Sequence, residues 1–373
     1  MSTNRSVLLT WGAVLMSRRA PIAALACALC ISTAAADNSS PRALAEAGHF
    51  KRLRVLSEPL LAANPNDAEA AYLMSRVDLA FGNLEAAASL AEKAVSMDDR
   101  NAAYHLQLAL VSGTMASGAG IFRAMKLGGR YKAEMQRAIE LDDKHADARL
   151  EFMYFYWYAP LIAGGDKKKA RALANDTLHV DPAEGYLAQA WIAERENEQD
   201  TAKLEGLYQQ AILANPRDYR VRVRVAGFYA SDSVRKYDQA ILQAREALKL
   251  DRGRSDAYTV LAKIYSVRQA WQELDTLLRE AERWNPDDLS PFYEAGRSLL
   301  QRNSDLLRAE SYFRKYLTQD PEAYKPDLAA AHRNLGLVLE KLGRKREAVA
   351  ELETAVRLSP NFEDAKKDLK RFR

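Results

Sequence analysis

The chain has 373 residues, of which 48% are hydrophobic and 28% are charged, so it can bury a large core and is not mainly disordered. It contains 17 glycines and 12 prolines, a low content that favours helices joined by short turns. The net charge of +4 becomes +1, with 51 basic and 50 acidic residues, when residues 1–36 are left out. This balance gives no basis for a nucleic-acid or anionic-membrane partner.

Residues 1–36 have the features of a secretory signal peptide. Arg18 and Arg19 precede the apolar run Ala20–Ala36, which ends in three alanines just before Asp37. We expect cleavage near Ala36 and a mature protein that is periplasmic or secreted. A membrane anchor is the alternative, although the 17 residues of the run are at the short end for spanning a bilayer.

Both cysteines of the chain, Cys27 and Cys30, fall in this same segment. The mature protein is therefore expected to have no disulfide and no cysteine metal site. Lipid attachment at Cys27 is a further alternative, but Ala24, three residues before it, makes a poor lipidation signal. A second apolar stretch upstream leaves the true start open between Met1 and Met16.

A repeating pattern begins after this segment. In residues 68–101, Gly82-Asn83 marks a turn between two helices, and small residues follow at Ala87, Ala91 and Ala94. Apolar residues three and four apart give each helix one apolar face. Residues 37–67 follow the same pattern imperfectly, and we expect them to form a degenerate first repeat that caps the end.

The next two units are longer than the 34 residues of 68–101. Residues 102–145 contain ten extra residues, which lie within Gly113–Gly129, and we expect Gly113–Gly120 to form a flexible inserted loop. Residues 146–184 contain five extra residues near Pro160–Gly165. These two insertions are the largest departures from the period.

The period then returns in units at residues 185–218, 219–254, 255–288, 289–323 and 329–362. The clearest is Ser255–Asp288, whose first helix carries Tyr258, Leu261, Ala262 and Tyr265 at positions 4, 7, 8 and 11. Its second helix is expected to end at Asn285, because the residue before a proline disfavours the α conformation. Residues 363–373 are predicted to form a helix that caps the last apolar face.

This 34-residue pattern resembles the tetratricopeptide repeat, W-x2-L-G-x2-Y followed by A-x3-F and P. Residues 329–362 match it well, with Leu335-Gly336, Ala348 and Pro360 in register. The resemblance implies an all-α fold, a right-handed α-solenoid of about eight to nine helix hairpins with a C-terminal capping helix. It also implies a concave groove for peptides or partner proteins, and no catalysis. The long third unit, followed by Ala159-Pro160, is similar to an arrangement in exported bacterial members of the family.

Six aromatic residues lie within the seven residues Phe152–Tyr158. Tyr154, Trp157 and Tyr158 fall at repeat positions that face the groove, and their i, i+3, i+4 spacing joins them into one patch. Such a patch can hold an apolar peptide anchor or stack on a sugar. The alternative is that the inserted loops cover these rings and create an enlarged local core.

A set of basic residues follows the same expected face. Arg220 and Arg224 share one side of their helix, while Lys263 and Arg297 occupy position 9 of the next two units. They are candidates for binding carboxylates of a partner. The alternative is an ordinary salt-bridged surface, because acidic residues such as Glu294 lie on the same side.

We therefore predict a non-enzymatic adaptor of the cell envelope that binds a protein or peptide through its concave groove. No cofactor or metal is expected, and contact with the membrane is peripheral at most. A glycan-binding module of polysaccharide export or assembly is the alternative. A glycoside hydrolase is more remote, because Glu151 beside the aromatic patch has no identifiable second carboxylate. The sequence leaves the partner and the oligomeric state open.

Overall fold

The computed structural model describes residues 40–196, 200–323 and 326–372. The predicted signal peptide, residues 1–36, lies outside the described residues. The chain divides into an N-terminal part that ends at Asn215 and a C-terminal part that begins at Pro216.

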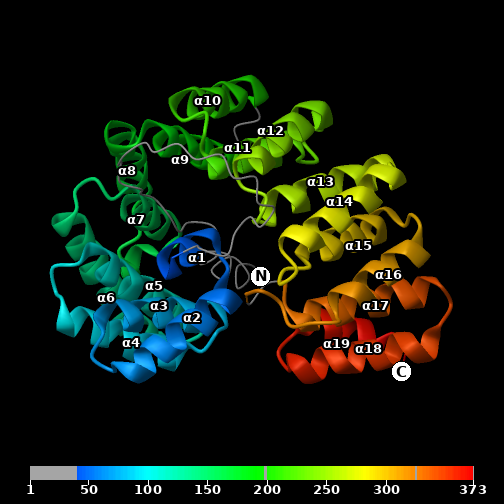
Figure 1. Ribbon diagram of the computed structural model, residues 1–373, viewed down its shortest axis with the longest axis horizontal. Coiled ribbons are helices and arrows are strands. Elements are labelled where there is room, and N and C mark those ends of the chain that lie inside the picture. The colour runs from blue at the N-terminus through cyan, green and yellow to red at the C-terminus, as the bar shows by residue number, and fades with distance from the viewer. Residues whose placement is uncertain (1–39, 197–199, 324–325, 373) are drawn as a thin grey trace, which may run out of the picture. The chain divides into compact units, whose positions relative to one another are not determined.

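The described residues of both parts form helices joined by short connections, and none of them form a strand. The helices of the N-terminal part are α1 (Pro41–Ala47), α2 (Phe50–Ala63), α3 (Ala68–Ala80), α4 (Leu84–Met97), α5 (Ala102–Ser117), α6 (Ile121–Leu141), α7 (Ala146–Tyr158), the 3₁₀ helix η2 (Leu161–Ala163), α8 (Lys167–Val180), α9 (Pro182–Arg195) and α10 (Thr201–Ala214) (Figure 1). The predicted all-α fold is confirmed.

The helices of the C-terminal part are α11 (Tyr219–Tyr229), α12 (Tyr237–Leu250), α13 (Asp256–Arg268), α14 (Trp271–Trp284), α15 (Ser290–Arg302), α16 (Leu306–Tyr316), α17 (Leu328–Lys341), α18 (Lys345–Leu358) and α19 (Glu363–Lys370). The short α19 packs against α18 and buries Ala365 and Leu369. No helix in the described part of the chain is both long and apolar enough to cross a bilayer.

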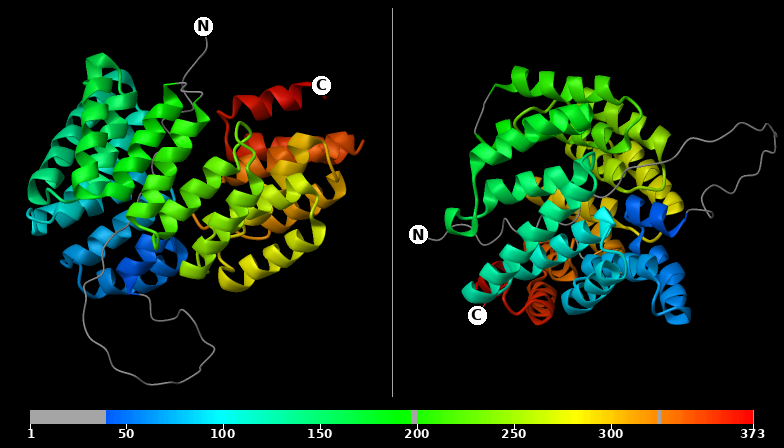
Figure 2. Two further views of the ribbon diagram at one scale, coloured as in Figure 1. Left: turned by 90° about the horizontal axis from the view of Figure 1, so that it is seen from above. Right: turned by 90° about the vertical axis from the view of Figure 1, so that its left-hand side faces the viewer.

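Helices pair into antiparallel hairpins, and each hairpin packs against the next one within its part. In the N-terminal part, α3 to α8 lie as a row of neighbouring helices (Figure 2). Small side chains make this close packing possible, because Ala87, Ala91 and Ala94 of α4 are fully buried. The C-terminal part has one continuous core from α11 to α18. The fold is therefore a helical repeat in which each hairpin buries its apolar face against its neighbours.

Helix starts follow from local capping. Asp67 and Asp218 accept hydrogen bonds from the first backbone N–H groups of α3 and α11. Asp181 ends α8 and also caps α9, whose first residue is Pro182. Helix α9 therefore begins three residues before the expected unit start at Gly185.

The expected flexible loop at Gly113–Gly120 is wrong for its first five residues, which are helical, and most of the insertion up to Gly129 is helical as well. They lengthen α5 to Ser117 and start α6 at Ile121, with only a short connection between them. The two helices stay paired here because Gly113 has no side chain. A Cβ on Gly113 would lie 2.8 Å from Cδ2 of the Tyr131 ring, so the ring rests directly on the α5 backbone.

The second insertion does form a loop, residues 159–166, which contains η2. Gly164 has a φ of +94°, and a Cβ on Gly165 would lie 1.8 Å from the Ala159 oxygen. Both positions therefore require glycine. Backbone bonds from Ala163 N–H and Gly165 N–H to the Pro160 oxygen, at 2.8 and 3.0 Å, hold the loop closed.

Candidate functional site

The predicted aromatic patch on α7 is packed inside the N-terminal part. Tyr154 and Trp157 are each only 7% exposed, and Tyr158 is half-buried. All three rings meet Trp191 of α9, with ring centroids 4.6, 5.8 and 5.5 Å from that of Trp191. The structure thus brings the three predicted residues together, but around a fourth ring and not on an open platform.

Cationic side chains complete this cluster. The guanidinium carbon of Arg195 lies 3.6 Å from the centre of the Trp191 ring, and its Nε donates to the Tyr158 hydroxyl at 2.8 Å. The Lys167 ammonium lies 4.7 Å from the centre of Trp157. The cover comes from α8 and α9, whereas the sequence had suggested the inserted loops. This geometry is that of the local core, the alternative left open by the sequence.

Glu151, the remote catalytic candidate, is also buried in α7, at 2% exposed. Burial, and secondarily the nearby charge of Asp147, raises the pKa of Glu151 well above its ordinary value. The Tyr131 hydroxyl donates to the backbone oxygen of Glu151 at 2.8 Å. The carboxyl group is therefore enclosed by protein and not presented to a substrate.

The basic residues of the C-terminal part have carboxylate neighbours. Arg297 binds both carboxylate oxygens of Glu294, at 2.9 and 2.8 Å, and Lys263 lies 3.9 Å from Asp232. Arg220 is buried, while Arg224 is half-buried. For Lys263 and Arg297 the geometry is that of a salt-bridged surface, and the binding of a partner by these four residues stays a prediction.

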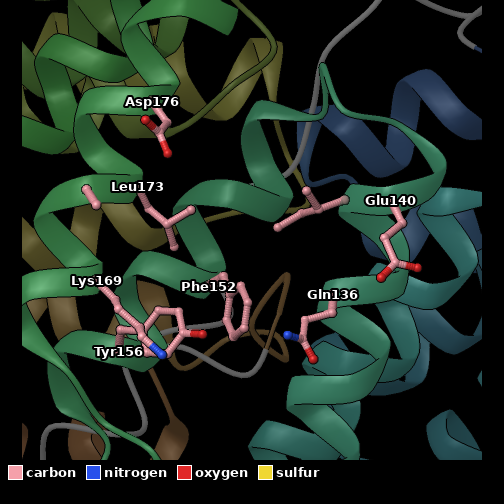
Figure 3. Close-up of a pocket in the computed structure, with 9 residues that line it drawn as sticks. Gln136, Glu140, Phe152, Tyr156, Lys169, Leu173 and Asp176 are labelled. Carbon is pink, nitrogen blue, oxygen red and sulfur yellow. The ribbon is translucent and has the colours of Figure 1, made fainter.

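A groove that the sequence did not reveal lies between α6 and α8, with α7 as its floor (Figure 3). Its volume is about 360 Å³. The rings of Phe152 and Tyr156 form the floor, with centroids 4.4 Å apart, and they are as buried as Trp157, at 5% and 7% exposed, so that only a small part of each ring lines the groove. Ile139 and Leu173 face each other across the groove from α6 and α8. The remaining lining residues are Gln136, Glu140, Lys169, Ala172 and Asp176.

The rim of the groove carries charges of both signs. The Lys169 ammonium lies 5.5 Å from the centre of the Tyr156 ring, and Asp176 stands two turns further along α8. Glu140 on the opposite rim pairs with Arg137 at 3.5 Å. Burial, and secondarily Asp166, raises the pKa of Tyr156. Its hydroxyl group can donate a hydrogen bond. The groove therefore offers an apolar floor with donors and acceptors around it.

The sequence contains one signal for the groove, the spacing of Phe152 and Tyr156, although their repeat positions predict a place in the core. Phe152 and Tyr156 sit one turn apart on the side of α7 opposite to Tyr154 and Trp157. Positions 7 and 11 of a repeat ordinarily pack inside. Here they are buried as well, and the small exposed part of each ring lies at the base of the groove.

The last hairpin, α17 and α18, is the part of the chain that matches a known repeat family. Residues 329–362 match the model of the tetratricopeptide repeat. Residues 329–362 form a tetratricopeptide repeat. The predicted resemblance is confirmed for this hairpin, and the other tetratricopeptide-like hairpins share its two-helix architecture.

Three solved structures are similar in helical architecture. Yeast Tom70 is 15% identical over 89% of this chain and 79% of its own, with a TM-score of 0.48. A human IFIT1 dimer with m7Gppp-AAAA is 15% identical over 85% of this chain and 78% of its own, with a TM-score of 0.45. Pseudomonas aeruginosa PilF is 19% identical over 62% of this chain and 97% of its own, with a TM-score of 0.40. No curated protein sequence matches the chain significantly.

Proposed function

We propose that this chain is a non-enzymatic scaffold that holds a peptide segment of a partner protein in the groove between α6 and α8. The observation that carries the proposal is the groove itself, a space of about 360 Å³ with two aromatic rings at its base. A space of this size accepts a large apolar side chain. The repeat hairpins on either side supply a rigid frame.

The rim explains how a peptide would be oriented. An apolar anchor on Phe152 and Tyr156 leaves the peptide backbone at the level of Gln136 and Lys169, whose N–H groups donate to carbonyl oxygens. Asp176 on the same rim accepts from a basic side chain of the peptide. The preferred ligand is therefore an apolar residue with a basic neighbour.

A peptide array tests this proposal directly. The labelled protein is applied to peptides that vary an apolar anchor and its flanking charges. Ala172 lines the groove and is exposed, so Ala172→Arg fills the mouth without disturbing the core. We expect it to weaken binding at least about tenfold, the loss of an anchor contact.

The matched control is Ala350→Arg, which places the same side chain on an exposed position of α18. It should leave peptide binding unchanged. Equal losses in both variants, or no peptide bound above background, would contradict the groove assignment.

The other proposed modes of binding can be compared with the geometry of the groove. Partner binding through Arg220, Arg224, Lys263 and Arg297 remains a separate proposal, and charge reversal of Arg224 tests it in the same array. The glycan-binding alternative relied on displayed rings, whereas Tyr154 and Trp157 are covered by Trp191. The near balance of 51 basic and 50 acidic residues outside 1–36 supports a peptide over a nucleic acid.

The proposed place of action is the cell envelope. Its support is the sequence of residues 18–36, two arginines followed by an apolar run and three alanines. Fractionation of the expressing cell, with N-terminal sequencing of the exported form, measures this. A new N-terminus at Asp37 in the periplasm is expected, and recovery of the whole chain in the cytoplasm would contradict it.

A further inference from the structure

Five large apolar side chains stand in solvent on the two segments that break the repeat period. Ile121, Phe122 and Met125 at the start of α6 are 72%, 86% and 53% exposed. Leu161 and Ile162 of η2 are 86% and 84% exposed. Helix α2 exposes three large apolar residues, Val55, Leu56 and Leu60, whereas α10 and α16 expose one each, Leu213 and Leu307. The two segments together therefore carry the largest group of exposed apolar side chains in the described part of the chain.

The two segments are neighbours in space. Helix α6 contacts η2, and a Cβ on Gly164 would lie 4.0 Å from the Lys132 ammonium. Phe122, Met125 and Lys132 share one face of α6, because they are three or seven residues apart. The same face continues to Gln136, which lines the groove toward α8. The apolar residues of α6 and η2 thus lie on one side of the hairpins, and we call these five residues the apolar tip.

The loop that carries Leu161 and Ile162 is held in place. Gly164 N–H donates to the Leu161 oxygen at 2.9 Å, and Asp166 N–H donates to the Tyr156 oxygen at 2.7 Å. The backbone is therefore fixed at both ends of η2, so the two side chains are kept in solvent by the fold.

Basic residues surround the apolar tip. Residues 119–132 contain four basic residues and no acidic one, and Lys167–Lys169 follow the η2 loop. Arg123 and Arg130 bond to Glu85 and Glu92 of α4. Lys167 and Lys169 lie over the rings of Trp157 and Tyr156. Lys126, Lys132 and Lys168 are exposed or half-exposed and form no ion pair with another described residue. The near-neutral total charge conceals this local imbalance.

We propose that the apolar tip docks on the surface of a bilayer that contains anionic lipids. Phe122, Leu161 and Ile162 enter the boundary between headgroups and acyl chains, and Lys126, Lys132 and Lys168 bind headgroup phosphates. Apolar side chains ringed by lysines are the signature of peripheral membrane binding. The five side chains of the apolar tip project outward and do not enclose a pocket. This favours a deformable lipid surface over a protein surface of complementary shape. This proposal is independent of the groove between α6 and α8.

The test uses the full chain and vesicles of phosphatidylethanolamine with phosphatidylglycerol, against vesicles of phosphatidylcholine alone. Because Ala20–Ala36 is itself apolar, the readout must be local. The chain has five tryptophans of its own, so the readout is the quenching by brominated phosphatidylglycerol that a variant gains over the parent protein. Phe122→Trp should gain quenching, whereas Leu307→Trp should not. The variant Leu161→Ser/Ile162→Ser should reduce this quenching at an equal lipid concentration, and Leu213→Ser should not.

A charge variant separates lipid classes. Lys126→Gln should weaken partitioning onto the phosphatidylglycerol vesicles about fivefold, the contribution of one lysine near an anionic surface. Lys345→Gln on α18, another exposed lysine, is the control and should have no effect. Equal quenching on phosphatidylcholine vesicles would overturn the anionic-lipid assignment. Membrane docking itself would be overturned if Phe122→Trp were not quenched. It would also be overturned if the apolar-tip variants bound vesicles unchanged but lost binding to a partner protein.

Discussion

Helices α6 to α8 and helices α14 to α18 differ in how the second helices of successive hairpins contact each other. In the second group, ion pairs connect second helices of successive hairpins, since Asp275 pairs with Arg308 at 2.7 Å and Glu282 with Lys315 at 2.5 Å. These partners are 33 residues apart, close to one repeat. Between α6 and α8 the described residues form no such pair, and a groove lies there instead. Where the period holds, ion pairs join these helices, and where it fails, a groove that we propose as a binding site lies between them.

The difference has a geometrical origin. The α3–α4 hairpin needs only residues 81–83 as its connection, whereas α7 and α8 are joined by residues 159–166. The longer connection contains η2, and the rings of α7 lie at the floor of the groove between α6 and α8. We therefore propose that the regular hairpins provide stability and the irregular ones binding, and four experiments can break or sharpen this division.

The largest expected effect is on the aromatic cluster, which belongs to the irregular hairpins but is packed as a core. Trp157→Ala should lower the free energy of unfolding by about 3–5 kcal/mol, the usual cost of truncating a buried aromatic residue. Urea unfolding followed by circular dichroism measures it. Leu161→Ala, on the exposed η2, should change stability by less than about 0.5 kcal/mol. A loss of less than about 1 kcal/mol of unfolding free energy in Trp157→Ala would contradict the burial of this ring and indicate that it lies at the surface.

A smaller effect is expected from the η2 loop. In Gly165→Ala the new Cβ would meet the Ala159 oxygen and carbon at 1.8 and 2.6 Å, so the backbone must move. We expect a loss of about 1–3 kcal/mol and faster amide hydrogen exchange in residues 159–166. Gly118→Ala is the control, because nothing lies within 4 Å of its Cβ position. Unchanged exchange in the loop would show that its closed form is not required.

The next effect depends on pH and concerns Glu151. Its raised pKa means that the folded state keeps this proton to a higher pH than the unfolded chain does, so stability falls as pH rises from the ordinary glutamate range. Glu151→Gln keeps the shape and removes the titration. The variant should be more stable than the parent above neutral pH, and the difference should shrink below about pH 4, where glutamate is protonated in both states. Parallel stability curves for the two proteins would contradict the burial of this carboxyl.

Sequence reasoning reached the fold because the pattern repeats. Small residues such as Ala91 and Ala262 recur at fixed positions, and each agreement reinforced the others, so the all-α hairpin architecture followed. The start of a helix was harder to predict where one dipeptide carries two signals. Asp181-Pro182 both ends α8 and starts α9, so α9 begins before the expected unit start. The site was harder to predict because it depends on contacts between hairpins. Trp191 lies in another unit from Trp157, and no local spacing shows that their rings meet.

The smallest expected effect tests the regular hairpins. Asp275→Asn and Arg308→Gln, each alone and together, form a double-mutant cycle on the ion pair between α14 and α16. Both side chains are partly exposed, so the coupling energy should be only about 0.2–1 kcal/mol and should fall with added salt. A matched cycle on Lys169 and Asp176, at the rim of the groove, should give no coupling, because the two side chains form no ion pair. If the groove cycle gave the larger value, its rim would be a stabilising element like those of α14 to α18, and the division of roles between the two regions would fail.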